Sequence, residues 1–131
     1  MSARSLVLDS SVWIEILNRG PLVRACTKEL NGVNRIFVPT LVLFEVYKRI
    51  AVSSSEDQAL SAIAMLSQHE VMDLTREVAL AAADLAMQRG LAMADSLVLA
   101  HAHQVGAVLL TLDNDFFGIP GAKILRGAAT I

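Results

Sequence analysis

The stretch Ser5-Leu6-Val7-Leu8-Asp9-Ser10-Ser11-Val12-Trp13-Ile14-Glu15 decides the fold. A short apolar run ends in one acid and two hydroxyl residues, and apolar residues at helical spacing then begin. The pattern predicts a strand that leads directly into a helix, which is the repeating unit of α/β proteins. Asp9 has two interpretations here. It either caps the helix by accepting hydrogen bonds from free backbone N–H groups, or it supplies a carboxylate to a metal site.

The same alternation continues along the chain. Strands are predicted at residues 6–8, 36–38, 71–72, 108–110 and 123–125, and helices at residues 11–18, 22–30, 40–52, 56–68, 77–89 and 94–105. Ser55 is a predicted helix cap and Gly90 a predicted helix stop. Strands that alternate with helices predict an α/β domain around a parallel sheet of about five strands. The length of 131 residues suits a single domain spanning residues 1–131.

Composition narrows the class of protein. Hydrophobic residues make up 54% of the chain, enough for a substantial core. The single cysteine, Cys26, excludes an internal disulfide and fits a reducing compartment. We find no signal peptide and no unbroken apolar run of about 20 residues, so we expect a cytoplasmic protein that does not enter a membrane. The net charge of −2 argues against a large basic surface for nucleic acid.

Four acids are placed so that they can meet. Asp9 follows the first predicted strand and Asp113 follows the fourth, whereas Glu45 and Asp95 lie in the early turns of two helices. In parallel sheets, ligands bind at the carboxyl ends of the strands, where the strand order reverses. We therefore expect these side chains to converge at one edge of the sheet.

Each acid also has a structural interpretation. Asp9 and Asp95 would cap helices, and Asp113 and Asp115 would close a turn. Glu45 would form an exposed ion pair with the cations three and four residues later. Glu15 is expected to face solvent, and Asp73 has no clear assignment. His101 and His103 are two residues apart on a helix, so they point in different directions and cannot bind one metal together.

Clustered carboxylates need a cation or a raised pKa. An oxygen-only ligand set favours Mg²⁺ or Mn²⁺, whose usual role is phosphoryl chemistry. The expected catalytic acids are Asp9, Glu45, Asp95 and Asp113. Of these, Asp9, Asp95 and Asp113 are expected to hold the metal. Ser11 and Thr111 are expected to donate hydrogen bonds that orient the ligands.

Four motifs occur in order along nearly the whole chain: Val-Leu-Asp9-Ser-Ser11, Glu45 on the helix after the second strand, Ala94-Asp95-Ser-Leu, and Thr111-Leu-Asp113-Asn-Asp115-Phe. Together they resemble the PIN domain. The short length and the segment Phe116-Phe117-Gly-Ile-Pro-Gly resemble the VapC toxins of bacterial toxin–antitoxin pairs.

The resemblance implies a three-layer sandwich and an endoribonuclease that depends on Mg²⁺ or Mn²⁺. It implies that Asp9, Glu45, Asp95 and Asp113 form the acidic site, with Ser11, Thr111 and Asp115 as lesser members. It also implies a homodimer, a cognate antitoxin whose tail occupies the site, and cleavage of tRNA or ribosomal RNA. The residues that bind RNA are unknown; candidates for phosphate contact are Arg19, Arg24, Lys28, Lys48 and Arg49.

Three other functions remain open from the sequence. A receiver-like phosphoacceptor domain also has an acidic pocket and a late lysine, for which Lys123 would stand. A catalytically inert PIN-like module would act only by binding a partner. A DNA-directed nuclease would use the same metal chemistry, so the acids alone do not separate RNA from DNA.

Overall fold

The computed structural model describes residues 4–126. Five strands form one sheet: β1 (Ser5–Leu8), β2 (Arg35–Pro39), β3 (Glu70–Met72), β4 (Val108–Thr111) and β5 (Ala122–Ile124). The helices are α1 (Ser10–Leu17), α2 (Val23–Lys28), α3 (Thr40–Ser53), α4 (Glu56–Leu66), α5 (Arg76–Arg89) and α6 (Met93–Gln104), with a 3₁₀ turn, η1 (Asn114–Phe116). Within residues 4–126, no helix has both the length and the apolar character needed to cross a membrane.

The sheet is parallel throughout and has the strand order β3-β2-β1-β4-β5. β1 lies at the centre, where Leu6 is paired with Ile36 of β2 and with Val108 of β4. The chain adds strands on one side of β1 and then changes to the other side, so the reversal of strand order lies between β1 and β4. The predicted α/β fold with a five-stranded parallel sheet is confirmed.

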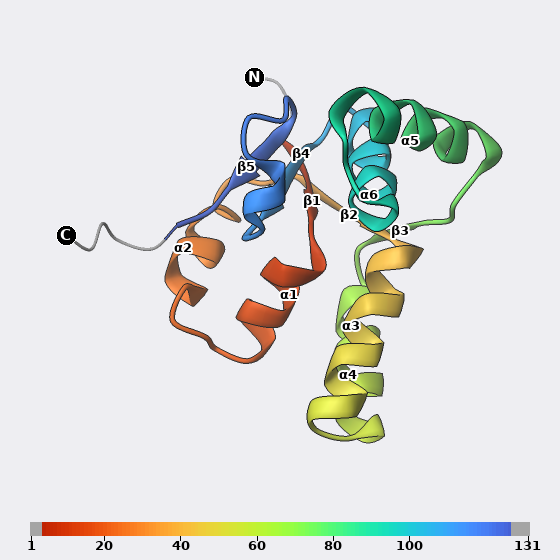
Figure 1. The fold of residues 1–131 in the computed structure, drawn as a ribbon. Helices are drawn as coiled ribbons and strands as arrows, with labels where there is room; N and C mark the ends of the chain where they lie inside the picture. The colour runs from red at the N-terminus through yellow and green to blue at the C-terminus, as the bar shows by residue number, and fades with distance from the viewer. Residues whose placement is uncertain (1–3, 127–131) are drawn as a thin grey trace.

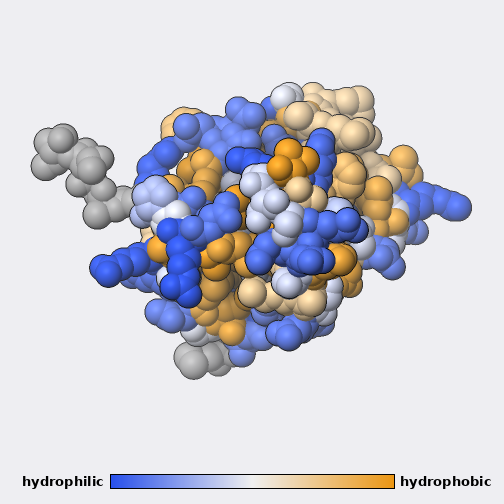
Figure 2. All heavy atoms as spheres, turned by 90° about the horizontal axis from the view of Figure 1, so that it is seen from below, coloured by the Kyte–Doolittle hydropathy of each residue, from blue (hydrophilic) through white to orange (hydrophobic). Residues whose placement is uncertain are grey.

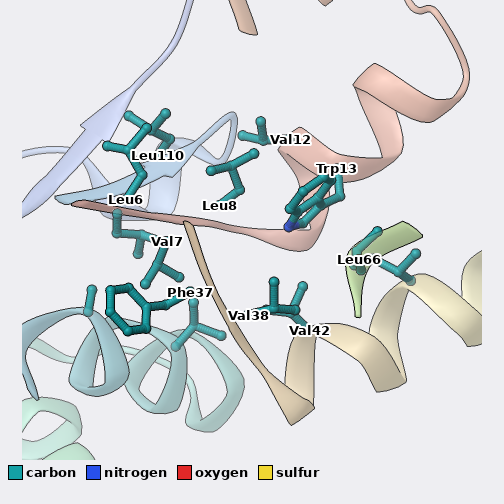
Figure 3. Close-up of a cluster of buried hydrophobic side chains, with 14 of the residues drawn as sticks. Leu6, Val7, Leu8, Val12, Trp13, Phe37, Val38, Val42, Leu66 and Leu110 are labelled. Carbon is teal, nitrogen blue, oxygen red and sulfur yellow. The ribbon is translucent and has the colours of Figure 1, made fainter. Parts of the chain in front are cut away.

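Helices cover both faces of the sheet. In Figure 1, α1 and α2 lie on one side and α5 and α6 on the other, whereas α3 and α4 form a hairpin that projects from the β2–β3 side. Figure 3 shows why β1 is apolar on both faces: Leu6 and Leu8 point towards α1, and Val7 points to the opposite side, where Phe37 also lies. All three β1 side chains are fully buried. A parallel strand covered on both faces has this near-continuous apolar sequence.

Local signals placed most of the helix ends correctly. The Ser55 hydroxyl accepts a hydrogen bond from the Gln58 N–H at the start of α4, and Gly90 ends α5 in the left-handed conformation, with φ of 69°. Glu15 differs from the prediction that it faces solvent. Its half-buried carboxylate accepts a hydrogen bond from the Leu22 N–H and thereby closes the loop between α1 and α2.

The central strand provides a direct test of this core. The Leu6→Ala substitution should lower the free energy of unfolding by about 2–5 kcal/mol, because it removes fully buried methyl groups and leaves a cavity. Chemical denaturation would measure the change. Leu80→Ala is the matched control, because Leu80 is 63% exposed on α5. An equal loss of stability in both variants would contradict this account of the core.

Candidate functional site

The four acids singled out in the sequence lie around one pocket of about 350 Å³ beyond the carboxyl ends of β1 and β4. Asp9 follows β1 directly, Glu45 lies on α3, Asp95 lies on α6 and Asp113 lies in the turn after β4. The remaining lining residues are Ser10, Ser11, Ile14, Phe44, Lys48 and Arg49. The pocket therefore lies at the reversal of strand order, where parallel sheets place their ligands.

Asp9 is 7% exposed, and three hydrogen bonds hold its carboxylate. Oδ1 accepts from the Ser10 N–H at 2.9 Å. Oδ2 accepts from the Ser11 hydroxyl at 3.0 Å and from the Thr111 hydroxyl at 2.8 Å. Asp9 is the N-cap residue of α1, so the capping interpretation describes its position correctly. Two of its three hydrogen bonds nevertheless come from side-chain hydroxyls, and one of these belongs to β4.

The two hydroxyl groups are themselves oriented by backbone donors. The Ser11 oxygen accepts from the Leu112 N–H at 3.1 Å, and the Thr111 oxygen accepts from the Asp113 N–H at 3.0 Å. An oxygen that accepts a hydrogen bond on one side directs its own proton to the other side, here towards Asp9. Ser11 and Thr111 thus fix the Asp9 carboxylate against the turn that carries Asp113, as the sequence predicted for these two residues.

Asp95, Asp113 and Asp115 form the tightest group of carboxylates. Each offers an oxygen that lies within 4.8 Å of an oxygen of the other two. Asp95 is not a helix cap, because Ala92 occupies that position and Asp95 lies inside the first turn of α6. Asp113 does close a turn, since its Oδ1 accepts from the Asp115 N–H at 2.9 Å. That bond brings Asp115, expected from the resemblance only as a lesser member of the site, into the group with the other two acids.

Glu45 is half-buried and faces the other acids across the pocket. Its ion pair with Lys48 or Arg49, the structural interpretation from sequence, is not formed. The ion pairs in the described part of the chain join Arg4 and Lys123 to Glu29 and Arg35 to Glu70. Lys48 instead lies 5.9 Å from the centre of the Phe44 ring.

Burial and mutual repulsion raise the pKa of three site carboxyls. For Asp9, desolvation is the main cause, opposed by the hydrogen bonds from Thr111, Ser11 and Ser10. For Glu45, desolvation acts first and the charge of Asp9 adds to it. For Asp95, desolvation together with the charges of Asp113, Asp9 and Asp115 raises the pKa to about 6. Among residues 4–126, none of these acids has an ion-pair partner that would offset the effect.

This arrangement suits a hard divalent cation. Its donor atoms are carboxylate oxygens, without thiolate or imidazole among the pocket-lining residues, and such a set favours Mg²⁺ or Mn²⁺ over zinc. A bound cation would also relieve the repulsion that raises the pKa of Asp95. Asp95, Asp113 and Asp115 are close enough to share one ion. Asp9 lies beside them, with its carboxylate already positioned by hydroxyl donors.

Other residues that could bind a metal or act in catalysis lie outside the pocket. Asp73 is exposed after β3. Cys26 is buried in the core, and His69 packs against Trp13 with ring centres 5.6 Å apart. His101 is buried, whereas His103 is exposed, so the two histidines do diverge as predicted. The sequence did not single out Ser10, Ile14 and Phe44, which also line the pocket. Their only signal was position: Ser10 follows Asp9, Phe44 precedes Glu45, and Ile14 lies one helical turn after Ser10.

The raised pKa of Asp95 predicts how pH affects stability without metal. Between pH 4 and 6 the folded protein retains a proton that the unfolded chain has released, so the free energy of unfolding falls as pH rises. Asp95→Asn removes this contribution. In EDTA, the melting temperature of the variant relative to the parent should therefore increase from pH 4 to pH 7. A difference that stays constant over this range would contradict the assignment.

Known structures share this fold. A toxin–antitoxin complex from Klebsiella pneumoniae has a chain that is 22% identical, with 93% of this chain and 96% of that chain covered and a TM-score of 0.74. A chain of VapBC2 from Rickettsia felis, bound to a promoter DNA fragment, is 21% identical. The match covers 93% of this chain and 99% of that chain, with a TM-score of 0.73. VapC20 from Mycobacterium tuberculosis, a Sarcin-Ricin loop cleaving toxin, is 17% identical. The match covers 92% of this chain and 99% of that chain, with a TM-score of 0.74.

The sequence itself supplies the family assignment. No curated protein sequence matches the chain. The model of the PIN domain family matches residues 6–121, a range that ends just before β5 and contains all four acids of the pocket. The chain therefore belongs to the PIN domain family.

Proposed function

We propose that this chain is a VapC-like endoribonuclease that hydrolyses phosphodiester bonds in RNA with Mg²⁺ or Mn²⁺. The observation that carries the proposal is the convergence of Asp9, Glu45, Asp95 and Asp113 on one pocket at the reversal of strand order. Asp9, Asp95 and Asp113 would hold the metal, and the closeness of Asp115 to Asp95 and Asp113 supports adding it to this set. When bound, the metal would lower the pKa of a water molecule and stabilise charge on the phosphate.

The side chains around the pocket would perform distinct tasks. Ser11 and Thr111 hold the Asp9 carboxylate in position at the edge of the pocket. Glu45 would orient the attacking water and accept its proton at a carboxylate oxygen, a task suited to a carboxyl whose pKa is raised. Lys48 and Arg49 line the same pocket and would contact the phosphate. Of the five candidates for phosphate contact, these two are the ones that lie at the acidic site.

The relatives support the biological role that we propose, the toxin of a type II toxin–antitoxin pair. Their structures include a toxin–antitoxin complex and VapBC bound to promoter DNA, and one relative is a Sarcin-Ricin loop cleaving toxin. We accordingly propose a cognate antitoxin as partner, a homodimer as the assembly, and tRNA or ribosomal RNA as the substrate class.

The receiver-like alternative has no support in the structure. A phosphoacceptor site would need its late lysine beside the acids, but Lys123 lies outside the pocket and donates to Glu29 at 2.7 Å. The inert-module alternative is disfavoured because the pocket retains its carboxylates. Cleavage of matched RNA and DNA strands would separate the ribonuclease from a DNA-directed enzyme.

Cleavage of total RNA with Mg²⁺ or Mn²⁺ is the primary test. Asp9→Asn and Asp95→Asn should each lower the rate by at least about 100-fold, since even residues that only support metal ligands contribute about 10- to 100-fold. EDTA should abolish cleavage. Asp73→Asn is the charge-matched control, because Asp73 is exposed outside the pocket, and it should cleave like the parent. Parent protein that binds Mn²⁺ but cleaves no RNA would refute the proposal.

Metal binding should also stabilise the fold, because the cation neutralises carboxylates that repel one another. At a Mn²⁺ concentration about 100 times Kd, the free energy of unfolding should rise by about 2.7 kcal/mol. Thermal unfolding with and without Mn²⁺ would show the shift. Asp95→Asn should reduce it and Asp73→Asn should not. An unchanged melting temperature at saturating Mn²⁺ would rule out a metal site in the folded protein.

A further inference from the structure

A second pocket, of about 470 Å³, lies between α2 and β5, and we call it the basic cleft. Its charged lining consists of four cations, Arg24, Lys28, Lys123 and Arg126, and one carboxylate, Glu29. The whole chain has a net charge of −2 and only 11 lysines and arginines, so the positive charge of this cleft is strongly local. The cleft is not apparent in the sequence, because its four cations are divided between residues 24–28 and residues 123–126.

The cations of the basic cleft are available to an anionic ligand. Arg24 and Lys28 are four residues apart on α2, so they share one face of the helix, and both are exposed. Neither forms an ion pair within residues 4–126. Glu29 accepts from Lys123 at 2.7 Å and from Arg4 at 3.4 Å, so the one acid of the cleft is shared between two cations. The pairing leaves the cleft with a clear excess of positive charge.

One hydrogen bond links the basic cleft to the loop that carries two acids of the site. Arg126 donates to the Asn114 side chain at 3.0 Å, and Asn114 stands between Asp113 and Asp115 in the chain. Arg126 follows β5 and Asp113 follows β4, so this end of the cleft lies at the carboxyl edge of the sheet. The other end reaches Glu29, which contacts Arg4 ahead of β1. Figure 2 shows the molecule from below, the side towards which β1 leads in Figure 1, with hydrophilic side chains spread across this face between smaller apolar areas.

Two exposed phenylalanines lie on elements of the acidic site. Phe117 follows η1 directly and is 79% exposed, and Phe44 lines the acidic pocket and is 61% exposed. Exposed aromatic rings next to a cationic groove are typical of surfaces that bind single-stranded nucleic acid, where bases stack on the rings and cations hold the backbone. A duplex would keep its bases stacked internally and would gain nothing from these rings.

We propose that the basic cleft binds the phosphodiester backbone of single-stranded RNA on one side of the bond that is cleaved. The inference rests on the proposed function, because it assumes that this bond lies in the acidic pocket. The carboxylates of the acidic pocket repel phosphates, and only two cations, Lys48 and Arg49, line that pocket, so we expect most of the affinity for the rest of the backbone to come from elsewhere. Cations set apart from the acids supply that affinity without neutralising the ligands of the metal. The cleft is thus a substrate-positioning surface rather than part of the reacting centre.

Charge reversal on α2 tests the proposal. Arg24→Glu with Lys28→Glu is compared with Arg76→Glu with Arg89→Glu on α5, which makes the same change in net charge. The pairs are matched, because Lys28 and Arg89 each lie in the last turn of their helix and all four side chains are exposed. In Figure 1, α5 lies on the opposite side of the molecule from α2. All proteins carry Asp9→Asn, so that binding is measured without cleavage, and circular dichroism confirms folding.

The probe is a fluorescein-labelled single-stranded RNA of about 20 nucleotides, titrated by fluorescence anisotropy at several salt concentrations. The α2 pair should raise Kd at least about ten-fold at low salt. It should also reduce the slope of log Kd against log salt by about 1.4, at about 0.7 for each phosphate that the cleft no longer neutralises. The α5 pair should bind like the parent. Equal effects from both pairs, or no measurable RNA binding by the parent, would overturn the proposal.

Two further results distinguish RNA binding by the cleft from binding of an acidic protein segment, and distinguish failure of this inference from failure of the proposed function. Unchanged RNA affinity in the α2 pair, combined with weaker binding of polyglutamate, would overturn the proposal and assign the cleft to an acidic protein segment. Cleavage by otherwise unmodified protein is measured in parallel. If that protein does not cleave RNA but the α2 pair still loses affinity, the proposed function fails while the RNA-binding cleft stands. If it cleaves and the α2 pair binds normally, the cleft assignment alone fails.

Discussion

The hydrogen bonds from Ser11 and Thr111 to the Asp9 carboxylate are the interaction on which the site depends. Thr111 lies 102 residues from Asp9, so this contact joins the two central strands at the point where the strand order reverses. Burying a carboxylate is costly unless hydrogen bonds replace its water, and here three do so. Because the same hydroxyl groups accept from the backbone of the next turn, the position of Asp9 fixes the position of Asp113.

The site keeps its acids close to one another at a cost to the folded chain. Desolvation and like charge act in the same direction on Asp9, Glu45 and Asp95, so each holds its proton more tightly than it would in water. Proteins accept such local strain mainly where a ligand or a reaction makes use of it. The rigid core beneath, with β1 buried on both faces, supplies the stability that this arrangement requires.

Much of the fold and of the acidic site could be predicted from the sequence. The five apolar runs became the five strands. The pattern was plainest in β1 and β4, because parallel strands that are buried on both faces contain few polar residues. The convergence of Asp9 and Asp113 followed from the shared direction of β1 and β4. The closeness of Asp115 to Asp95 and Asp113 could not be predicted, because it depends on the turn that the Asp113 side chain closes. Glu15 was misassigned because its partner, the Leu22 N–H, lies in a loop without regular spacing. The basic cleft was invisible for a similar reason, since only the complete topology brings α2 beside β5.

The central position of β1 has a consequence for biosynthesis. Within this domain β1 is made first, and its neighbour β4 with the hydroxyl of Thr111 follows only about a hundred residues later. Contacts between such distant segments form late, because closing the long loop costs conformational entropy before the contacts can stabilise the fold. A growing chain therefore holds Asp9 without its β4 partner until translation of the domain is nearly finished. The order of strands in the sheet thus makes the acidic centre one of the last parts of the domain to be assembled during synthesis.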